Sequence, residues 1–117
     1  MPADALLDWI ARFIEYLRVE RNLAEKTREN YQRQLETIAK QIAIDSWHQL
    51  NVEQVRKLMA HARRQGLSAR SISLRLSALR SFCSYLIQHN VLDHNPASSV
   101  SAPKVGKPLP KQLNVDE

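Results

Sequence analysis

The helical spacing of the apolar residues is the feature that most constrains the fold of this chain. Apolar side chains that recur every three or four residues lie on one face of an α-helix. The clearest such stripe lies over residues 69–89 and consists of Ile72, Leu76, Leu79, Cys83 and Leu86. Shorter stripes predict further helices over residues 5–19, 25–42 and 52–65. Because glycine is scarce and no strand-like β-branched run is present, we expect an all-α fold of four helices.

Two of the expected helices carry signals at their ends. Asn51 followed by Gln54 is the pattern of a capping box at the start of the third helix, and Gly66 is placed to end that helix. Ser68 is the expected cap of the fourth helix. The segment just before Asn51 predicts a short turn anchored by Trp47.

A change of composition divides the chain near residue 92. Residues 1–92 hold all the expected helices. The remainder, residues 93–117, is rich in proline, with Pro96, Pro103, Pro108 and Pro110. Proline excludes helix and stiffens the chain, so we expect a helical domain followed by a linker toward a domain that is absent here. The lone cysteine, and the lack of a signal peptide or a membrane-length apolar stretch, predict a cytoplasmic protein with no membrane partner.

The net charge of +5 is concentrated in one segment. Residues 46–90 carry seven Arg or Lys against the single acid Glu53, a sum of +6, whereas residues 1–20 sum to −2. Such a segment is either a solvated basic face or the contact surface for a polyanion, most often a nucleic acid. Most of these bases are arginines, which suit bidentate contacts to phosphate.

The expected helix over residues 25–42 separates its charges by side. One flank holds Lys26, Asn30, Arg33 and Thr37, and the other holds Glu25, Glu29 and Glu36. The predicted phosphate contacts of this helix are Lys26, Thr27 and Arg33. One flank could thus contact phosphates while the acids point away. Tyr31 is a candidate for packing or for phosphate contact.

The expected helix over residues 69–89 has an unusual polar face of serines and arginines. Serine is a mediocre helix former, and a plain solvated face would more often carry Glu, Lys and Gln. Small hydroxyl side chains flanked by arginine permit close approach to a DNA groove, or to a packed helix of a partner protein. The residues of this polar face are Arg70, Ser73, Ser77, Ser81 and Ser84, with Arg75 and Arg80 at its margins.

No constellation of catalytic residues is found in the sequence. The histidines are scattered without cysteine partners, which argues against a metal site, and two glycines cannot make a phosphate-binding loop. Cys83 lies on an apolar stripe and is expected in the core rather than as a reactive thiol. Tyr85 is expected to pack, and Trp9 and Trp47 to lie in the core or at an interface. We therefore expect no enzyme activity, cofactor, metal or small-molecule partner for this chain.

Five short stretches in this order resemble a known family. They are Thr27–Tyr31, Arg75–Phe82, Asn95–Ala97, Ala102–Lys104 and Leu109–Lys111. The resemblance is to tyrosine recombinases of the Xer type and spans essentially the whole chain. Within the family, residues 65–82 and 100–113 most resemble the branch that acts with a second recombinase, of the XerD type, in chromosome dimer resolution.

The resemblance implies a SAM-like, core-binding domain that clamps a recombination-site duplex together with a catalytic domain. The second and fourth helices would face double-stranded DNA, and the catalytic residues would belong to the absent domain. The implied DNA-binding set is Lys26, Thr27, Tyr31, Arg33, Arg70, Ser71, Ser73, Arg75, Ser77, Arg80 and Lys104. One departure is Ala24, which stands where the family often has a serine cap before the second helix.

The resemblance also implies that the first helix contacts a sister recombinase protomer in a tetramer. Its segment is net acidic and therefore a poor partner for phosphate. Apolar surface near Trp9 and Phe13 is the expected docking area.

Two other functions fit the same pattern, a stand-alone helical DNA-binding regulator and a helical protein-interaction module. Strong, salt-sensitive binding to random duplex DNA would argue against the interaction module. The reading frame beyond Glu117 would separate a recombinase from a regulator.

Overall fold

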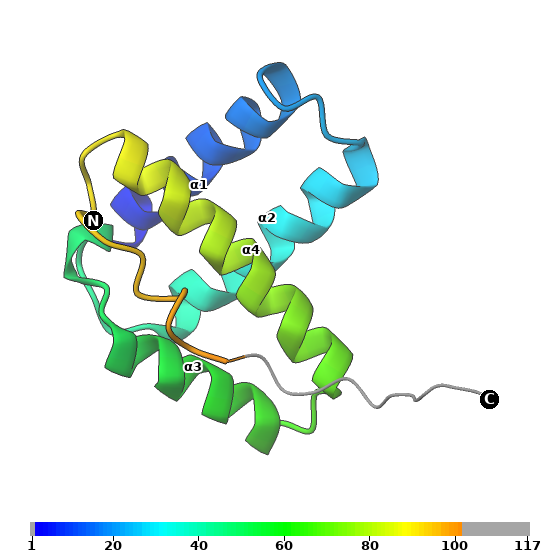
Figure 1. Cartoon of the computed structure of the whole chain (residues 1–117), viewed down its shortest axis with the longest axis vertical. Helices are drawn as coiled ribbons and strands as arrows, with labels where there is room; N and C mark the ends of the chain where they lie inside the picture. Colours follow the sequence, from blue (N-terminus) through cyan, green and yellow to red (C-terminus); the bar gives the residue numbers. More distant parts are fainter. Residues whose placement is uncertain (1, 102–117) are drawn as a thin grey trace.

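The computed structural model describes residues 2–101, with side chains described from Ala5 onward. The chain forms α1 (Pro2–Val19), α2 (Glu25–Gln41), a short 3-10 helix (Trp47–Gln49), α3 (Val52–Arg64) and α4 (Ala69–Gln88). No strand occurs within residues 2–101, so the expected all-α fold is confirmed. Helix α4 packs against each of the other three helices and crosses α2 (Figure 1).

The ends of α3 and α4 follow from their local sequence. Asn51 and Gln54 form a reciprocal capping box, because the backbone N–H of each donates to the other's side chain, at 3.0 and 2.9 Å. Gly66 adopts a φ of +88° after α3, a left-handed conformation that favours glycine. Ser68 caps α4 by accepting from the Ser71 N–H at 3.1 Å. Helix α2 begins after Ala24 with no side-chain cap.

Helix boundaries differ slightly from expectation. Helix α1 begins at Pro2 rather than Ala5, because proline is compatible with the first helical turn, where no backbone N–H donor is needed. Ile42 and His89, expected inside helices, are instead the C-caps of α2 and α4.

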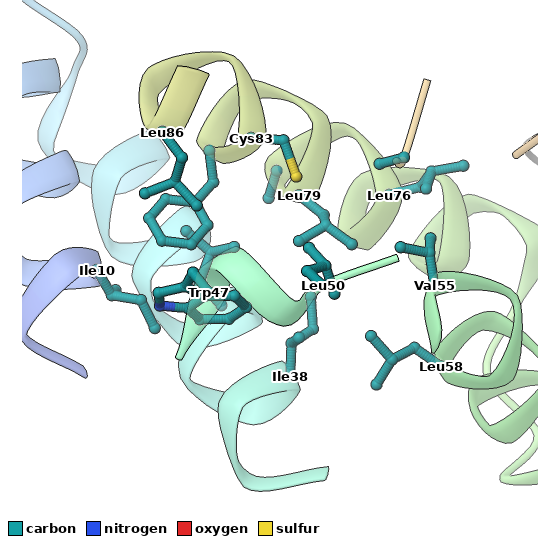
Figure 2. Close-up of a cluster of buried hydrophobic side chains, with 14 of the residues drawn as sticks. Ile10, Ile38, Trp47, Leu50, Val55, Leu58, Leu76, Leu79, Cys83 and Leu86 are labelled. Atoms are coloured by element: carbon teal, nitrogen blue, oxygen red, sulfur yellow. The ribbon is translucent and has the colours of Figure 1, made fainter. Parts of the chain in front are cut away.

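Trp47 lies at the centre of the core. It is fully buried, and its Nε1 donates to the Leu6 carbonyl at 2.9 Å. Its ring packs edge-on against that of Phe82, with 4.9 Å between the ring centroids. Figure 2 shows Leu79 and Cys83 of α4 pointing toward the short helix that carries Trp47. The tryptophan thereby ties α1 and α4 together across the bundle.

The packed part of the chain continues past residue 92. After α4 the chain folds back along that helix, and Pro96, Ala97 and Val100 are buried. The orange segment in Figure 1 runs between α3 and α4. The structure thus covers only the beginning of the expected linker, and that beginning belongs to the core. Among the described helices, none combines the length and apolarity that crossing a membrane requires.

Candidate nucleic-acid interface

The face of α4 that points away from the core is polar and lacks acids. Arg70, Ser77, Ser84 and Gln88 are exposed, Ser73 and Ser81 are half-buried, and the sequence of α4 contains no Asp or Glu. The α4 side of the bundle therefore presents hydroxyl groups and positive charge. Leu74, 41 % exposed, is the apolar exception on this side.

The neighbouring side of α2 carries the predicted phosphate-contacting residues. Lys26, Thr27 and Arg33 are exposed, and Asn30 is half-buried beside them. Arg33 Nη1 donates to Asn30 Oδ1 at 3.3 Å, which holds the guanidinium along the helix surface. We define the α2–α4 face as Lys26, Thr27 and Arg33 of α2 with Arg70, Ser73, Ser77 and Ser84 of α4.

Tyr31 joins the two helices at one edge of this face. It is half-buried and lines a groove of about 220 Å³ between α1, α2 and α4. Ser81 and Ser84 of α4 line the same groove, with Tyr16 and Tyr85. Tyr31 is thus placed both to pack and to reach the border of the α2–α4 face.

Arg75 lies beneath the face rather than on it. It is only 8 % exposed, and its Nε donates to Gln34 Oε1 of α2 at 2.8 Å. Gln34 Nε2 in turn donates to Asn30 Oδ1 at 3.5 Å. Burial lowers the pKa of the Arg75 guanidinium, and its buried Nη1 has no hydrogen-bond partner within residues 2–101. Arg75 therefore links α4 to α2 through a polar contact below the surface.

Arg80 lies at the opposite margin of α4 and is half-buried. Its Nε donates to the Ala97 carbonyl at 3.1 Å, and its Nη2 donates to the Val100 carbonyl. Asn95, which had not been a candidate, donates to the Arg80 carbonyl at 3.1 Å. The sequence feature that could have identified Asn95 is its place in the Asn95–Ala97 stretch, one of the five that resemble the family.

Ser71 contributes mainly to the α4 cap, where Ser68 Oγ donates to Ser71 Oγ. Lys104 lies outside the described residues.

Two acids of α1, Asp8 and Glu15, are paired with bases on the same helix. Arg12 Nε lies 3.2 Å from Asp8 Oδ2, and Arg18 Nε donates to Glu15 Oε1 at 3.1 Å. The hydrogen bond from Arg18 lowers the pKa of Glu15. These two pairs carry no net charge, in contrast with the exposed bases of the α2–α4 face.

The expected docking area on α1 is partly wrong. Phe13 is only 1 % exposed, because its ring packs against Phe82 and Tyr85 in the core. Trp9 is half-buried beneath Arg12, whose guanidinium lies 4.9 Å from the ring centre. The exposed large apolar side chains of α1, among those described, are Leu7 and Val19.

Cys83 and Tyr85 are buried in the core. Burial raises the pKa of the Cys83 thiol from 9.0 to about 12, so the thiol is protonated and inert at neutral pH. Burial also raises the pKa of Tyr85. Within the described residues, no three His, Cys, Asp or Glu side chains are grouped to hold a metal.

Comparison with known proteins agrees with the all-α fold. Residues 10–90 match the model of the phage integrase N-terminal SAM-like domain. The chain is 49 % identical over 111 residues to tyrosine recombinase XerC of Escherichia coli O1:K1 / APEC, and to that of Escherichia fergusonii. Each match covers 92 % of this chain and 37 % of the relative, so the chain spans little more than a third of these relatives. No solved structure matches it. The chain belongs to the phage integrase N-terminal SAM-like domain family.

Proposed function

We propose that the chain is the DNA-binding part of a site-specific tyrosine recombinase and that the α2–α4 face holds the duplex. The observation that carries the proposal is the polar, acid-free outer side of α4. Helix α4 packs against α2, on which Lys26 and Arg33 are exposed. Serine side chains let the α4 backbone approach another surface closely while offering hydrogen-bond donors.

The width of the DNA major groove fits this geometry. The groove, about 12 Å wide, admits one α-helix, and α4 is the helix whose outer face is small and polar. Arg70 then lies where it can reach a guanine edge, which supplies base discrimination. Lys26, Thr27 and Arg33 would contact phosphates, which position the protein without reading sequence. Arg75 would support this surface by fixing α4 against α2.

The wider activity rests on the family. In a protein of the relatives' length, this domain would form one half of a clamp, and the catalytic residues would lie in the other half. The partners would be a recombination-site duplex and sister protomers, one of them XerD-like, in a tetramer for chromosome dimer resolution. The chain alone is expected to bind DNA without forming a covalent adduct, and Leu7 and Val19 of α1 are the apolar side chains placed to contact a sister protomer.

A charge-matched pair of variants tests the face. Lys26→Ala with Arg33→Ala removes two positive charges from the face, whereas Arg12→Ala with Arg18→Ala removes two from α1. The first pair should weaken binding to specific and random duplexes alike. It should also reduce the steepness of the log–log salt dependence by about 1.8, at about 0.9 per phosphate contact.

The control pair should leave the salt dependence nearly unchanged. Equal effects of the two pairs would show that only net charge matters, and the α2–α4 face would then have no special role. Thermal unfolding of both pairs shows that the fold is retained.

A helical protein-interaction module is the second candidate, and the exposed Leu74 favours it. Leu74 could anchor a partner helix that packs on the small serines of α4. On DNA the same side chain would contact a thymine methyl group. Leu74→Ala should therefore reduce DNA affinity modestly if α4 lies in the groove, and should leave it unchanged if the face serves a protein.

A further inference from the structure

The chain that follows α4 is fastened to the side of that helix. Asn95 Nδ2 donates to the Arg80 carbonyl at 3.1 Å and to Ser84 Oγ at 3.3 Å, while its Oδ1 accepts from the Ala97 N–H at 3.1 Å. In return, Arg80 donates from Nε to the Ala97 carbonyl and from Nη2 to the Val100 carbonyl. We call this group, Arg80, Asn95, Ala97 and Val100, the exit clasp.

The exit clasp is reinforced by burial. The Pro96 and Ala97 side chains are fully buried, and Val100 is 8 % exposed. Ser98 Oγ also donates to the Asn95 carbonyl at 2.8 Å, which tightens the turn. An arginine is suited to this role because its planar fork can donate to two carbonyls at once, which a lysine ammonium cannot match in geometry.

The exit clasp determines where the chain leaves the domain. Helix α4 ends at Gln88, and Arg80 lies about 12 Å back along the helix at 1.5 Å per residue. Ala97 and Val100 therefore lie beside the middle of α4 and not at its end, in the orange segment that runs between α3 and α4 in Figure 1. Ser84, which Asn95 contacts, belongs to the α2–α4 face, so this exit lies at the edge of that face.

We propose that Arg80 and Asn95 are positioning residues that hold the chain exit beside the bound duplex. The DNA part of this inference rests on the function proposed above. A tether that starts close to the DNA raises the effective concentration, at the same duplex, of any DNA-binding segment that follows the tether. Without the exit clasp, the tether would start at the far end of α4 and would include the freed residues 93–100, which widens the volume it explores. The Arg80 guanidinium serves this geometry by bonding protein carbonyls in place of phosphates.

A distance measurement without DNA tests the exit clasp itself. Spin labels are placed at Gln88→Cys and Ser101→Cys, and Cys83 can remain because its buried thiol does not react. The matched substitutions are Arg80→Gln and Arg70→Gln, the same change at two sites on α4. We expect a narrow distance distribution in the starting protein and in Arg70→Gln, and a broad one in Arg80→Gln.

Asn95→Ala provides a second way to open the exit clasp without altering α4. It should broaden the distribution in the same way, and thermal unfolding of each variant verifies that the bundle is intact. A distribution that stays narrow in both Arg80→Gln and Asn95→Ala would overturn the proposal.

A cleavage experiment tests the position of the exit on DNA. An iron chelate attached at Ser101→Cys generates hydroxyl radicals, which cut bound duplex only near the attachment point. With the starting protein, we expect cuts confined to a short stretch of the duplex. With Arg80→Gln, the cuts should be spread over a longer stretch. With Arg70→Gln, less protein binds, but the cuts made by the bound protein should stay at the same positions. Bound DNA that is never cut would overturn the placement of the exit. Absence of any DNA binding would instead refute the proposed function, and the spin-label distances would still decide whether the exit clasp fixes the exit.

Discussion

Arg75 is an uncommon residue because it is buried with a guanidinium that is only partly satisfied. Its Nε bonds Gln34, while its buried Nη1 has no partner in the described part of the chain. A buried charge without full compensation costs free energy, so its aliphatic stem and its one hydrogen bond must offset that cost.

Replacing Arg75 with methionine separates the stem from the charge. Arg75→Met keeps most of the packing and removes the unpaired donor, so the free energy of unfolding should be unchanged or raised by up to about 1 kcal/mol. Arg75→Ala also removes the aliphatic stem and should lower the free energy of unfolding by on the order of 2 kcal/mol. Denaturant unfolding measures both. Equal losses in the two variants would show that the guanidinium itself holds α4 against α2.

Cys83 predicts how stability changes in alkaline solution. Burial raises its pKa from 9.0 to about 12, so between these values the unfolded chain loses a proton that the folded chain retains. Its contribution is therefore complete below pH 9 and is lost as the pH rises toward 12, with a slope of up to about 1.4 kcal/mol per pH unit.

The variant Cys83→Ala isolates this effect. Its stability at neutral pH should be lower because of the lost packing, but its decline above pH 9 should be shallower than that of the unchanged chain. Tyr85, whose pKa burial also raises, acts in the same direction in both proteins and cancels in the comparison. Parallel curves for the two proteins would mean that the thiol becomes ionised while still in the folded core.

For individual residues of α4, the sequence predicted the exposure of the serines better than that of the arginines. The period of α4 correctly places Ser77 and Ser84 on the outside and Cys83 inside. The helical period fixes the direction of each Cα–Cβ bond. An arginine side chain at the margin of the apolar stripe, however, is long enough to turn toward the protein or toward solvent. Arg75 turns inward to Gln34, and Arg80 turns to the chain that follows α4.

At the level of helices, the capping residues predicted where helices begin and end. Asn51, Gln54, Gly66 and Ser68 place the ends of α3 and the start of α4 within a residue of the observed boundaries. These signals are local hydrogen bonds and backbone conformations, which a short stretch of sequence specifies by itself. Trp47 could be assigned to a short turn, but its bond to Leu6 depends on the tertiary fold.

Ser77 lies near the centre of the exposed side of α4 and offers a direct test of that helix. Ser77→Glu places a carboxylate on the proposed DNA-facing side, where repulsion from phosphates should weaken binding on the order of tenfold at low salt. Helicity should not suffer, because glutamate is the better helix former. Ser77→Ala is the control and should bind almost normally. Undiminished binding by Ser77→Glu would place the DNA on another surface.

At the level of the whole molecule, the sequence did not predict that residues just after position 92 would be buried. Pro96, Ala97 and Val100 show no helical or strand period, so composition alone assigns them to a linker. The structure buries them against α4, and it is the Arg80 and Asn95 bonds that hold them there. Contacts of irregular segments depend on the assembled core and cannot be deduced from periodicity.

Exposed bases lie on more than one helix of the described chain. Asp8 and Glu15 of α1 are paired with bases of their own helix, whereas Lys26, Arg33 and Arg70 are exposed on the α2–α4 face. Further exposed bases lie on α3, namely Arg56, Lys57, Arg63 and Arg64. Arg75 and Arg80 bond within the protein and are not counted as phosphate contacts. On the proposed face, three basic side chains are then left to contact the duplex.

The measurement that tests the central claim most directly is a salt titration of DNA binding by this chain. Affinity for a recombination-site duplex and for a scrambled duplex would be followed by fluorescence anisotropy between low and physiological salt. With two or three phosphates neutralised by the bases of the α2–α4 face, the log–log slope should be roughly −2 to −3 for both duplexes. A small preference for the recombination site is expected from Arg70. An affinity that does not change with salt, or no measurable binding at low salt, would contradict the account.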